Sequence, residues 1–395
     1  MLPTVKYGLE VIVWLSALSI TCWAQLLVSA NDGKVFLNDG VIEYVKSGKD
    51  TITIFDLGDD NPKVITELEA PNSVISPPSN VAIYPDATMV LVTSARKYEG
   101  DPPKQVSDDR LTIIDLQSRR NGGLPAVVAT LKVGKGPAGV AINRSATLAL
   151  VANRDEGSIS VIRLADPKVV SKVSLGDNKS GPSAIAFTPD GTRALVTLYG
   201  VDAVPTGTKV AILRIRDERV ELTDRMITTG LGPYGLDISR NGNIAVVANL
   251  GGGVTGDADV VSVIDLEQDP VRVVNAASVA PSPEGIKLSS DARFLAVSSV
   301  NGTHKTKSSA FYRDAGILQI YAVLGTRLEK VAEAESGHWC QGVAWSENAR
   351  RLYLQCMVEK EIQVFSFDRS KPGDLRRMSS LKIDGGPAGL DMSHN

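Results

Sequence analysis

The sequence predicts an all-β fold, a seven-bladed β-propeller with four antiparallel strands per blade. Three observations lead to this prediction. One hairpin-like motif recurs along the chain, its copies lie about 50 residues apart, and further strand-like runs follow each copy. A unit of this size cannot bury its own apolar surface, so it must stack on its neighbours.

The recurring motif is clearest at residues 137–153, which read PAGVAINRSATLALVAN. It consists of Pro-x-Gly, a short apolar run, a four-residue turn and a second apolar run, which is the pattern of a β-hairpin. The other copies begin at Pro78, Pro182, Pro233, Pro283, Cys340 and Pro387. These seven starts predict seven blades, each opening with its innermost strand.

Two more strands are expected after each hairpin. The third strand alternates between apolar and polar residues, as in RLTIIDL at 110–116 and VVSVIDL at 260–266. A fourth strand, such as AVVATLKV at 126–133, follows in most repeats. Four antiparallel strands per repeat are typical of a propeller blade.

The two ends of the propeller are expected to share one blade. Residues 25–30 match a second strand, and residues 389–393 match a first strand. A ring closed by the N- and C-terminal strands in one blade has no free sheet edge.

Residues 1–24 differ from the rest of the chain. An apolar run from Val11 to Ile20 precedes small residues at Cys22 and Ala24, which fit a signal-peptidase site. We therefore expect a signal peptide at 1–24, a single propeller domain at 25–395, and a secreted or periplasmic protein. The weakly basic start leaves an uncleaved membrane anchor as the alternative.

The charge balance limits the classes of partner. The formal net charge is −3, which argues against the basic surface that neutralises nucleic-acid phosphates. After the signal peptide no stretch is apolar enough to span a bilayer. We expect no nucleic-acid partner, no membrane contact after signal removal, and a monomer.

Cys340 and Cys356 are expected to form a disulfide. Both flank the turn of one hairpin copy, symmetrically about Asn348, so they should face each other on the first and second strands. Export would place them in an oxidising compartment. A reactive thiol near His338 is the alternative.

The repeats PAGVAINRSATLALVAN and PYGLDISRNGNIAVVAN, each followed by a VIDL-like strand, resemble the YVTN-type repeat family. These are secreted bacterial seven-bladed propellers with WD40-like repeats, and the lactonase-like propellers are more distant members. The resemblance covers nearly all of the chain after Ala24. The lactonase branch carries a Gly-Pro-Arg-His segment; the corresponding openings here are Gly-Pro-Ala, Gly-Pro-Ser and Gly-Pro-Tyr.

Loop lengths point to one face as the functional one. The connections between second and third strands emerge, with those between blades, on what we call the upper face. Five of these connections are long: 31–49, 95–109, 199–208, 250–259 and 301–315. The turns on the lower face stay at about four residues. Binding residues often occupy loops held by a rigid scaffold, so we expect a small molecule or protein partner at the upper face.

Candidate catalytic residues on this face are His338, His304 and Glu284. Histidine beside a carboxylate can serve as a general acid or base, whereas two solvated loop histidines are the alternative. A zinc site normally has about three or four protein ligands, and these three residues are the only candidates of the right type. We therefore expect no metal. The expected ligand-binding residues are Trp339, Gln341, Arg154, Tyr234, Tyr312 and Arg313.

Two charged residues are expected inside the channel. Asp237 and Lys287 occupy equivalent positions of neighbouring innermost strands and should pair, because an unpaired buried charge is costly.

The sequence leaves the function open between two classes. The first is a binding or scaffold protein that acts through its upper face. The alternative is a lactonase-like hydrolase or isomerase with its site at the channel mouth, or a large subunit that docks a redox partner. No nucleophile elbow, phosphate loop, HExxH or CxxCH motif occurs, so no cofactor is expected and catalysis is not assigned.

Overall fold

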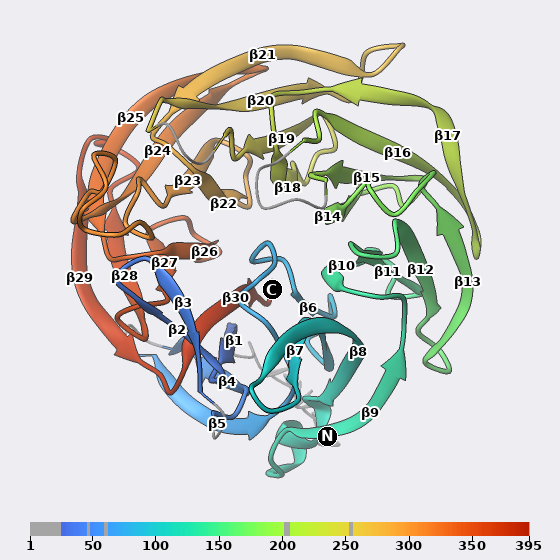
Figure 1. Ribbon diagram of the computed structural model, residues 1–395. Coiled ribbons are helices and arrows are strands. Elements are labelled where there is room, and N and C mark those ends of the chain that lie inside the picture. The colour runs from blue at the N-terminus through green and yellow to red at the C-terminus, as the bar shows by residue number, and fades with distance from the viewer. Residues whose placement is uncertain (1–24, 46–47, 59–61, 201–205, 253–255, 395) are drawn as a thin grey trace, which may run out of the picture.

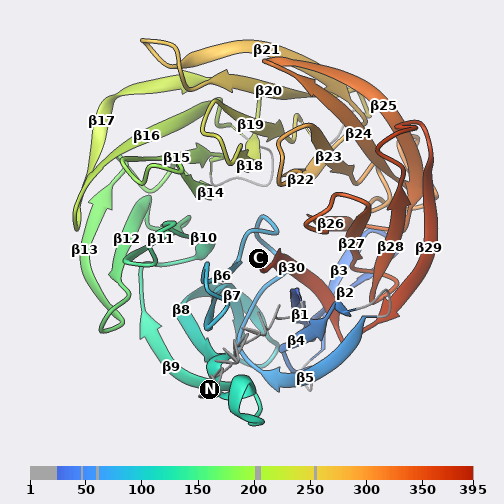
Figure 2. The ribbon, with the colours of Figure 1, turned by 180° about the vertical axis from the view of Figure 1, so that it is seen from behind.

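The computed structural model describes residues 25–394, except 46–47, 59–61, 201–205 and 253–255. Seven four-stranded antiparallel sheets surround a central axis, which confirms the predicted propeller (Figure 1). The same ring is seen from the other face in Figure 2. The predicted signal peptide lies outside the described residues.

Six blades run in chain order from the innermost strand outward. Blades 2 and 3 contain β6 (Val81–Ile83), β7 (Met89–Glu99), β8 (Lys104–Asp115), β9 (Ala126–Lys132), β10 (Pro137–Ile142), β11 (Leu148–Asn153), β12 (Ser158–Arg163) and β13 (Lys168–Ser174). Blades 4 and 5 contain β14 (Pro182–Phe187), β15 (Arg193–Leu198), β16 (Lys209–Arg216), β17 (Arg219–Thr228), β18 (Pro233–Ile238), β19 (Ile244–Asn249), β20 (Asp259–Asp265) and β21 (Arg272–Val279). Blades 6 and 7 contain β22 (Pro283–Leu288), β23 (Phe294–Ser299), β24 (Gly316–Leu324), β25 (Arg327–Ser336), β26 (Cys340–Trp345), β27 (Arg351–Cys356), β28 (Glu361–Phe367) and β29 (Leu375–Lys382). A short 3₁₀ helix, Gln117–Asn121, follows β8.

Blade 1 is built from both ends of the described chain, as predicted. Its strand order is β30 (Gly386–Met392), β1 (Leu26–Asp32), β4 (Thr51–Asp56) and β5 (Lys63–Glu69). Both terminal strands are slightly longer than the sequence predicted. Val28 pairs with Asp391, and the Leu26 amide donates to Ser393 Oγ at 2.8 Å. This pairing closes the ring at the seam.

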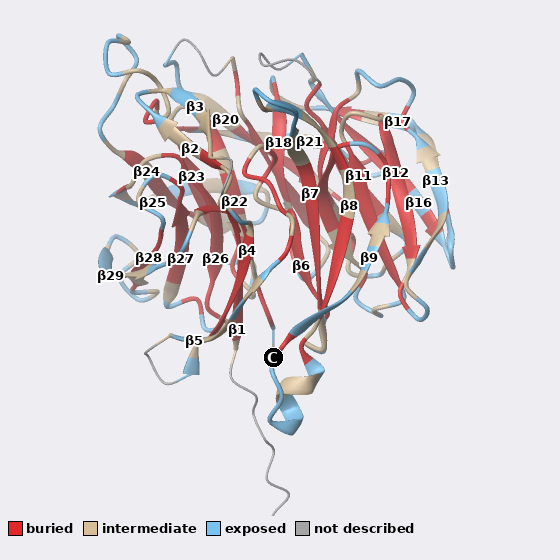
Figure 3. Cartoon of the chain, turned by 60° about the horizontal axis from the view of Figure 1, so that its bottom comes forward, coloured by how far each residue is buried: buried red, intermediate tan, exposed pale blue. Residues whose placement is uncertain are grey.

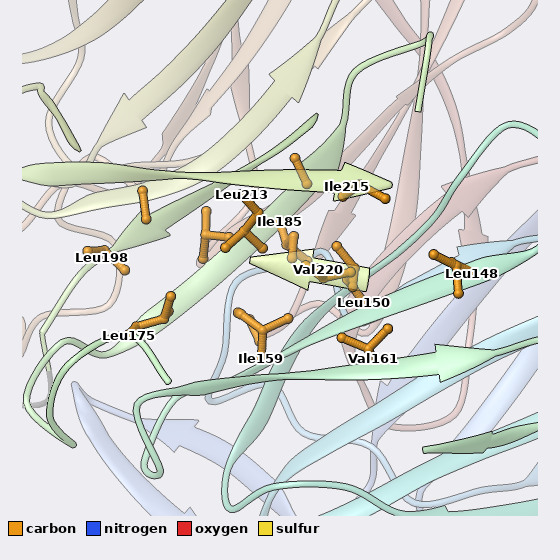
Figure 4. Close-up of a cluster of buried hydrophobic side chains, with 14 residues drawn as sticks. Leu148, Leu150, Ile159, Val161, Leu175, Ile185, Leu198, Leu213, Ile215 and Val220 are labelled. Carbon is orange, nitrogen blue, oxygen red and sulfur yellow. The ribbon is translucent and has the colours of Figure 1, made fainter. Parts of the chain in front are cut away.

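The core lies between neighbouring blades. Inner strands such as β1, β11 and β19 are buried along their whole length, while the outermost strands, such as β5 and β13, alternate between exposed and intermediate residues (Figure 3). Between blades 3 and 4, Leu150 and Ile159 pack with Ile185 and Leu213 in one apolar cluster (Figure 4). Burial of both sheet faces explains why these strands read as nearly continuous apolar runs.

Glycines near the start of the innermost strands allow close approach of adjacent blades. A Cβ on Gly285 would lie 1.8 Å from the Gln341 carbonyl oxygen. A Cβ on Gly235 would lie 2.7 Å from the Glu284 carbonyl oxygen. These positions serve packing.

Two of the long upper-face connections differ from the loops expected from the sequence. Residues 31–49 contain a separate hairpin, β2 (Val35–Asn38) paired with β3 (Val41–Tyr44). Residues 95–109 mostly extend β7 and β8 above blade 2, where Lys97 pairs with Val106. Tyr98 of this extension stacks on Tyr44, with ring centroids 4.2 Å apart. Pairing between the two arms satisfies the backbone groups that a loop would leave to solvent.

Candidate functional site at the upper channel mouth

The innermost strands enclose a central channel of about 620 Å³. Strand β22 runs along it from Glu284 near the upper mouth to Lys287 farther down. Arg240 and His394 lie at the lower end of the same channel. Glu284 therefore places a carboxyl group at the upper mouth of the channel.

Glu284 is held by two neutral side chains from blade 7. Gln341 Nε2 donates to Glu284 Oε2 at 2.5 Å, and the Trp339 side chain also hydrogen-bonds the carboxyl group. Burial raises the pKa of Glu284 to about 7, against the opposing effect of these two hydrogen bonds. A carboxyl that is half-ionised at neutral pH can accept and return a proton.

Two buried tyrosines lie near Glu284. Tyr199 follows β15 and Tyr234 lies in β18, and their ring centroids are 5.2 Å apart. Burial raises the pKa of Tyr234 well above its usual value, the charge of Glu284 adds to this effect, and Arg154 opposes it. Tyr234 therefore remains protonated at neutral pH and can act as a hydrogen-bond donor.

Arg154 completes the group of residues at the channel mouth. It follows β11, its guanidinium carbon lies 4.4 Å from the Tyr199 ring centroid, and it hydrogen-bonds the side chains of both tyrosines. Its neighbour Asp155 is instead engaged by Arg96. A cation stacked on an aromatic ring is well placed to hold an anionic group of a ligand.

The altered hairpin of blade 7 supports this arrangement. The predicted disulfide between Cys340 and Cys356 is confirmed, and the two residues face each other on β26 and β27. Trp339 precedes the disulfide with φ of 47° and is only 8% exposed. Its amide donates to Thr303 Oγ1 at 2.9 Å. A left-handed conformation at a bulky residue persists only where neighbouring contacts hold it.

The predicted histidine–carboxylate constellation is not assembled by the interactions of the described residues. His338 Nδ1 lies 2.6 Å from Glu359 Oε1, and its Nε2 lies 3.4 Å from Asp314 Oδ1. Burial and then the charge of Lys305 lower the pKa of His304 to about 4, and its Nδ1 atom is buried. Within 25–394 and outside the gaps, no interaction joins Glu284 to either histidine.

Tyr312 and Arg313 lie on the upper rim with His338. The Tyr312 hydroxyl donates to Asp314 Oδ1 at 2.8 Å, and Arg313 Nη1 donates to the Tyr312 carbonyl at 2.7 Å. Apart from His304, the predicted site residues thus separate into two groups. The first group, at the channel mouth, is Glu284, Gln341, Trp339, Tyr234 and Arg154. The second group, at the rim, is His338, Tyr312 and Arg313.

Sequence reasoning placed Tyr199 on the upper face but did not select it, and it overlooked Glu359. Tyr199 occupies the same position after a second strand that Arg154 occupies one blade earlier, so the repeat alignment contained a signal for it. Glu359 meets His338 through the conformation of the turn before β28, which no sequence pattern specified. Among the described residues, no group of three His, Cys, Asp or Glu side chains could hold a metal ion.

The charged residues inside the channel connect blades. Lys287 Nζ lies 3.6 Å from Asp237 Oδ1, as the sequence suggested. Asp237 Oδ2 also accepts the Leu288 amide at 2.8 Å, and Asp391 Oδ2 accepts the Ile83 amide at 2.9 Å. Each carboxylate therefore ties its own innermost strand to the next blade, which is a structural role.

Several solved structures share this architecture. A putative 6-phosphogluconolactonase from Bacteroides uniformis superposes with a TM-score of 0.71 at 16% identity, covering 94% of this chain and 99% of that one. The periplasmic gluconolactonase of Pseudomonas aeruginosa gives 0.66 at 19% identity, with the same two coverages. These two proteins, described as lactonases, share the seven-bladed propeller fold of this chain. A functionally unknown protein from Desulfotomaculum acetoxidans gives 0.67 at 17% identity, covering 87% and 96% of the two chains.

Sequence comparison adds no closer relationship. No protein-family profile matches the chain, and no curated protein sequence is significantly similar to it. No helix among the described residues has the length and hydropathy needed to cross a membrane. At identities below 20% the structural similarity concerns the lactonase-like fold and leaves the chemistry to the residues of this site.

Proposed function

We propose that this protein is an extracytoplasmic hydrolase of small cyclic esters, with its active site at the upper channel mouth. The observation that carries the proposal is that Glu284, a carboxyl with pKa about 7, lies near enough to Tyr234 for its charge to help keep that hydroxyl protonated. An acid–base group near neutrality and a neighbouring hydrogen-bond donor are what ester hydrolysis by water requires.

Three residues of the mouth act directly in this reaction. The Glu284 carboxylate takes a proton from a water molecule, whose oxygen forms a bond to the lactone carbonyl carbon. Tyr234 donates a hydrogen bond to the carbonyl oxygen as negative charge develops there. The ring C–O bond then breaks, and Glu284 returns the proton to the leaving oxygen, which gives an open-chain hydroxy acid. Arg154 would hold an anionic substituent of the substrate.

Structural similarity supports the reaction class, but one difference in sequence means that the catalytic residues of the lactonase branch cannot be transferred to this chain. The neighbours described as gluconolactonases share the fold with this chain. The Gly-Pro-Arg-His segment of the lactonase branch has no counterpart in the described inner-strand openings. In our proposal Glu284 and Tyr234 therefore supply the chemistry from blades 5 and 6.

The test is turnover on a panel that includes gluconolactone and 6-phosphogluconolactone. Replacing Glu284 by Gln should lower kcat at least about 100-fold, the usual contribution of a general base. The matched control is Glu69→Gln, a change on the exposed strand β5, which should leave kcat unchanged. His338→Ala separates the two groups: loss of turnover there, with Glu284→Gln unaffected, would contradict the proposal.

A binding role without turnover is the second candidate. It is favoured by the partners of Glu284, the neutral side chains Gln341 and Trp339, which keep the carboxyl engaged and supply no basic group. Calorimetry with gluconate and gluconolactone distinguishes the two functions. The binding function would be favoured by two results together. Arg154→Gln weakens binding of these ligands, and the wild type shows no hydrolysis when assayed at steps of about one pH unit from about pH 5 to about pH 9.

An extracytoplasmic location is part of the proposal. The disulfide Cys340–Cys356 is the structural observation that supports it, because such bonds persist in oxidising compartments. Cell fractionation combined with N-terminal sequencing tests the location. A mature protein that begins at Gln25 in the extracytoplasmic fraction is expected, whereas a cytoplasmic protein with free thiols would refute it.

A further inference from the structure

The β2–β3 hairpin belongs to blade 1 by sequence, but it also contacts blades 2, 6 and 7, and it lies beside β28 of blade 7 in Figure 1. At its tip, Asp39 Oδ1 accepts the Lys307 amide at 2.7 Å. On its inner side, Val35 is 3% exposed and lies in one apolar cluster with Trp339 and Met357. The hairpin therefore covers the part of the upper mouth to which Trp339 belongs.

The base of the hairpin is fixed by an ionic cluster. Lys34 Nζ contacts Asp50 and lies 3.2 Å from Asp32 Oδ1, and it donates to the Asn72 carbonyl at 3.0 Å. At Gly33 a Cβ would lie 1.9 Å from the Lys49 carbonyl oxygen, so the two arms of the connection approach closely. Anchors at the base and the tip hold the hairpin in one position over the mouth.

Trp339 links this cover to Glu284. One side of the residue faces the apolar cluster, while its side chain hydrogen-bonds the Glu284 carboxyl. Its backbone is held by Thr303 Oγ1 and by the Met357 amide, which donates to the Trp339 carbonyl at 3.2 Å. A change in the packing of the cluster should therefore move the indole and open the carboxyl to water.

We propose that the β2–β3 hairpin is a functional part of the channel-mouth site, and that Val35 is a positioning residue that holds Trp339 against Glu284. The hairpin excludes water from one side of the carboxyl and so maintains its proton-accepting behaviour. The chemical consequence rests on the proposed hydrolase function, whereas the positioning itself is independent of it.

The groups that face Glu284 are few. Gln341 and Trp339 approach from the side of blade 7, and Tyr234 approaches from blade 5. Tyr199 and Arg154 lie beyond Tyr234. His338 precedes Trp339 in the chain and faces Glu359 and Asp314 instead of Glu284. Because Tyr234 stays protonated at neutral pH, a titration near pH 7 sensed at Trp339 is assigned to Glu284 when Glu284→Gln removes it and His338→Ala leaves it in place.

The experiment is a pH titration of the full-length protein labelled with 5-fluorotryptophan, followed by ¹⁹F NMR. The Trp339 resonance is identified by its loss in Trp339→Phe. In the wild type its chemical shift should titrate with a midpoint near the Glu284 pKa of about 7, and Glu284→Gln should abolish the transition. Val35→Ala should lower the midpoint by about one pH unit, because water would then stabilise the carboxylate.

The control on the same hairpin is Val41→Ala, since Val41 is 56% exposed. It should leave the midpoint unchanged, while Leu37→Ala, at the edge of the cluster, should lower it like Val35→Ala. An unchanged midpoint in both cluster variants, with thermal unfolding still cooperative, would overturn the positioning role. Because this measurement needs no substrate, a shifted midpoint without lactone turnover would reject the hydrolase function alone.

Discussion

Cys340 faces Cys356 across β26 and β27 at the position where Pro137 faces Asn153 in blade 3. In blade 3, Asn153 Nδ2 donates to Ser158 Oγ and Ser160 Oγ, both at 3.0 Å, and so connects the second strand to the third. In blade 7 the covalent bond connects the second strand to the first instead. The repeat thus secures the upper end of the second strand by two different means.

Replacing both cysteines by alanine should lower the free energy of unfolding. The disulfide joins residues 16 apart in sequence, and the chain-entropy contribution of such a loop is about 3 kcal/mol. Urea denaturation of the double variant, followed by far-UV circular dichroism, measures the loss. Reduced wild-type protein should show the same loss, and a reduced protein as stable as the oxidised one would show that the sheet alone holds this hairpin.

The junction between the C-terminal strand and blade 2 should respond to the loss of one hydrogen bond. Asp391 Oδ2 accepts the Ile83 amide at 2.9 Å and ties the C-terminal strand β30 to blade 2. Asp391→Ala should lower the free energy of unfolding by about 2 kcal/mol, as expected for a hydrogen bond to a charged group. The control Asp224→Ala, on the exposed strand β17, should leave the melting temperature unchanged. Equal melting temperatures for the two variants would contradict this contact.

The sequence predicted the fold because its information is local and repeated. Pro-x-Gly openings, turns and alternating third strands recur in register, so one hairpin such as 137–153 explains the others. Glu284, Gln341, Tyr234 and Arg154 were found for the same reason. Each lies at the upper end of a repeat strand, and closure of the ring brings these ends together around one axis.

What the sequence did not predict depends on contacts outside the repeat. The pairing of His338 with Glu359 follows from the turn before β28, where Lys360 has φ of 52°. The extension of β7 and β8, and the packing of the β2–β3 hairpin on Trp339, join segments far apart in the chain. Neither contact produces a periodic pattern, so the separation into mouth and rim groups could not be predicted from the sequence.

Gly285 should tolerate no side chain. A Cβ at this position would lie 1.8 Å from the Gln341 backbone carbonyl, which cannot move without shifting β26. Gly285→Ala should destabilise the protein by roughly 1–3 kcal/mol, the usual cost of overpacking. The control is Gly373→Ala, where the nearest atom is 3.7 Å away and a methyl group fits. Chemical denaturation of both variants tests the difference, and a Gly285→Ala protein as stable as its control would contradict the close approach.

His304 should make the protein less stable in mild acid. Burial, followed by the charge of Lys305, lowers the pKa of His304 from the model-compound value of 6.5 to about 4. Between these two values the unfolded chain binds a proton that the folded protein excludes, so folding stability rises with pH. The stability that neutral His304 preserves at pH 7 is therefore lost progressively as the pH falls from about 6.5 to about 4, by at most about 3 kcal/mol.

The variant His304→Gln isolates this contribution from the buried carboxyls Asp50 and Asp259, which titrate near pH 6 with the opposite sign. Both carboxyls are present in the wild type and in the variant, so the difference in unfolding free energy between the two proteins removes their effect. The unfolding free energy of the variant should rise relative to that of the wild type as the pH is lowered from about 7 to about 4.5, because only the wild type loses stability through His304. A difference that stays constant across this range would show that the imidazole is solvated in the folded protein, and that the 301–315 loop does not bury it against blade 6.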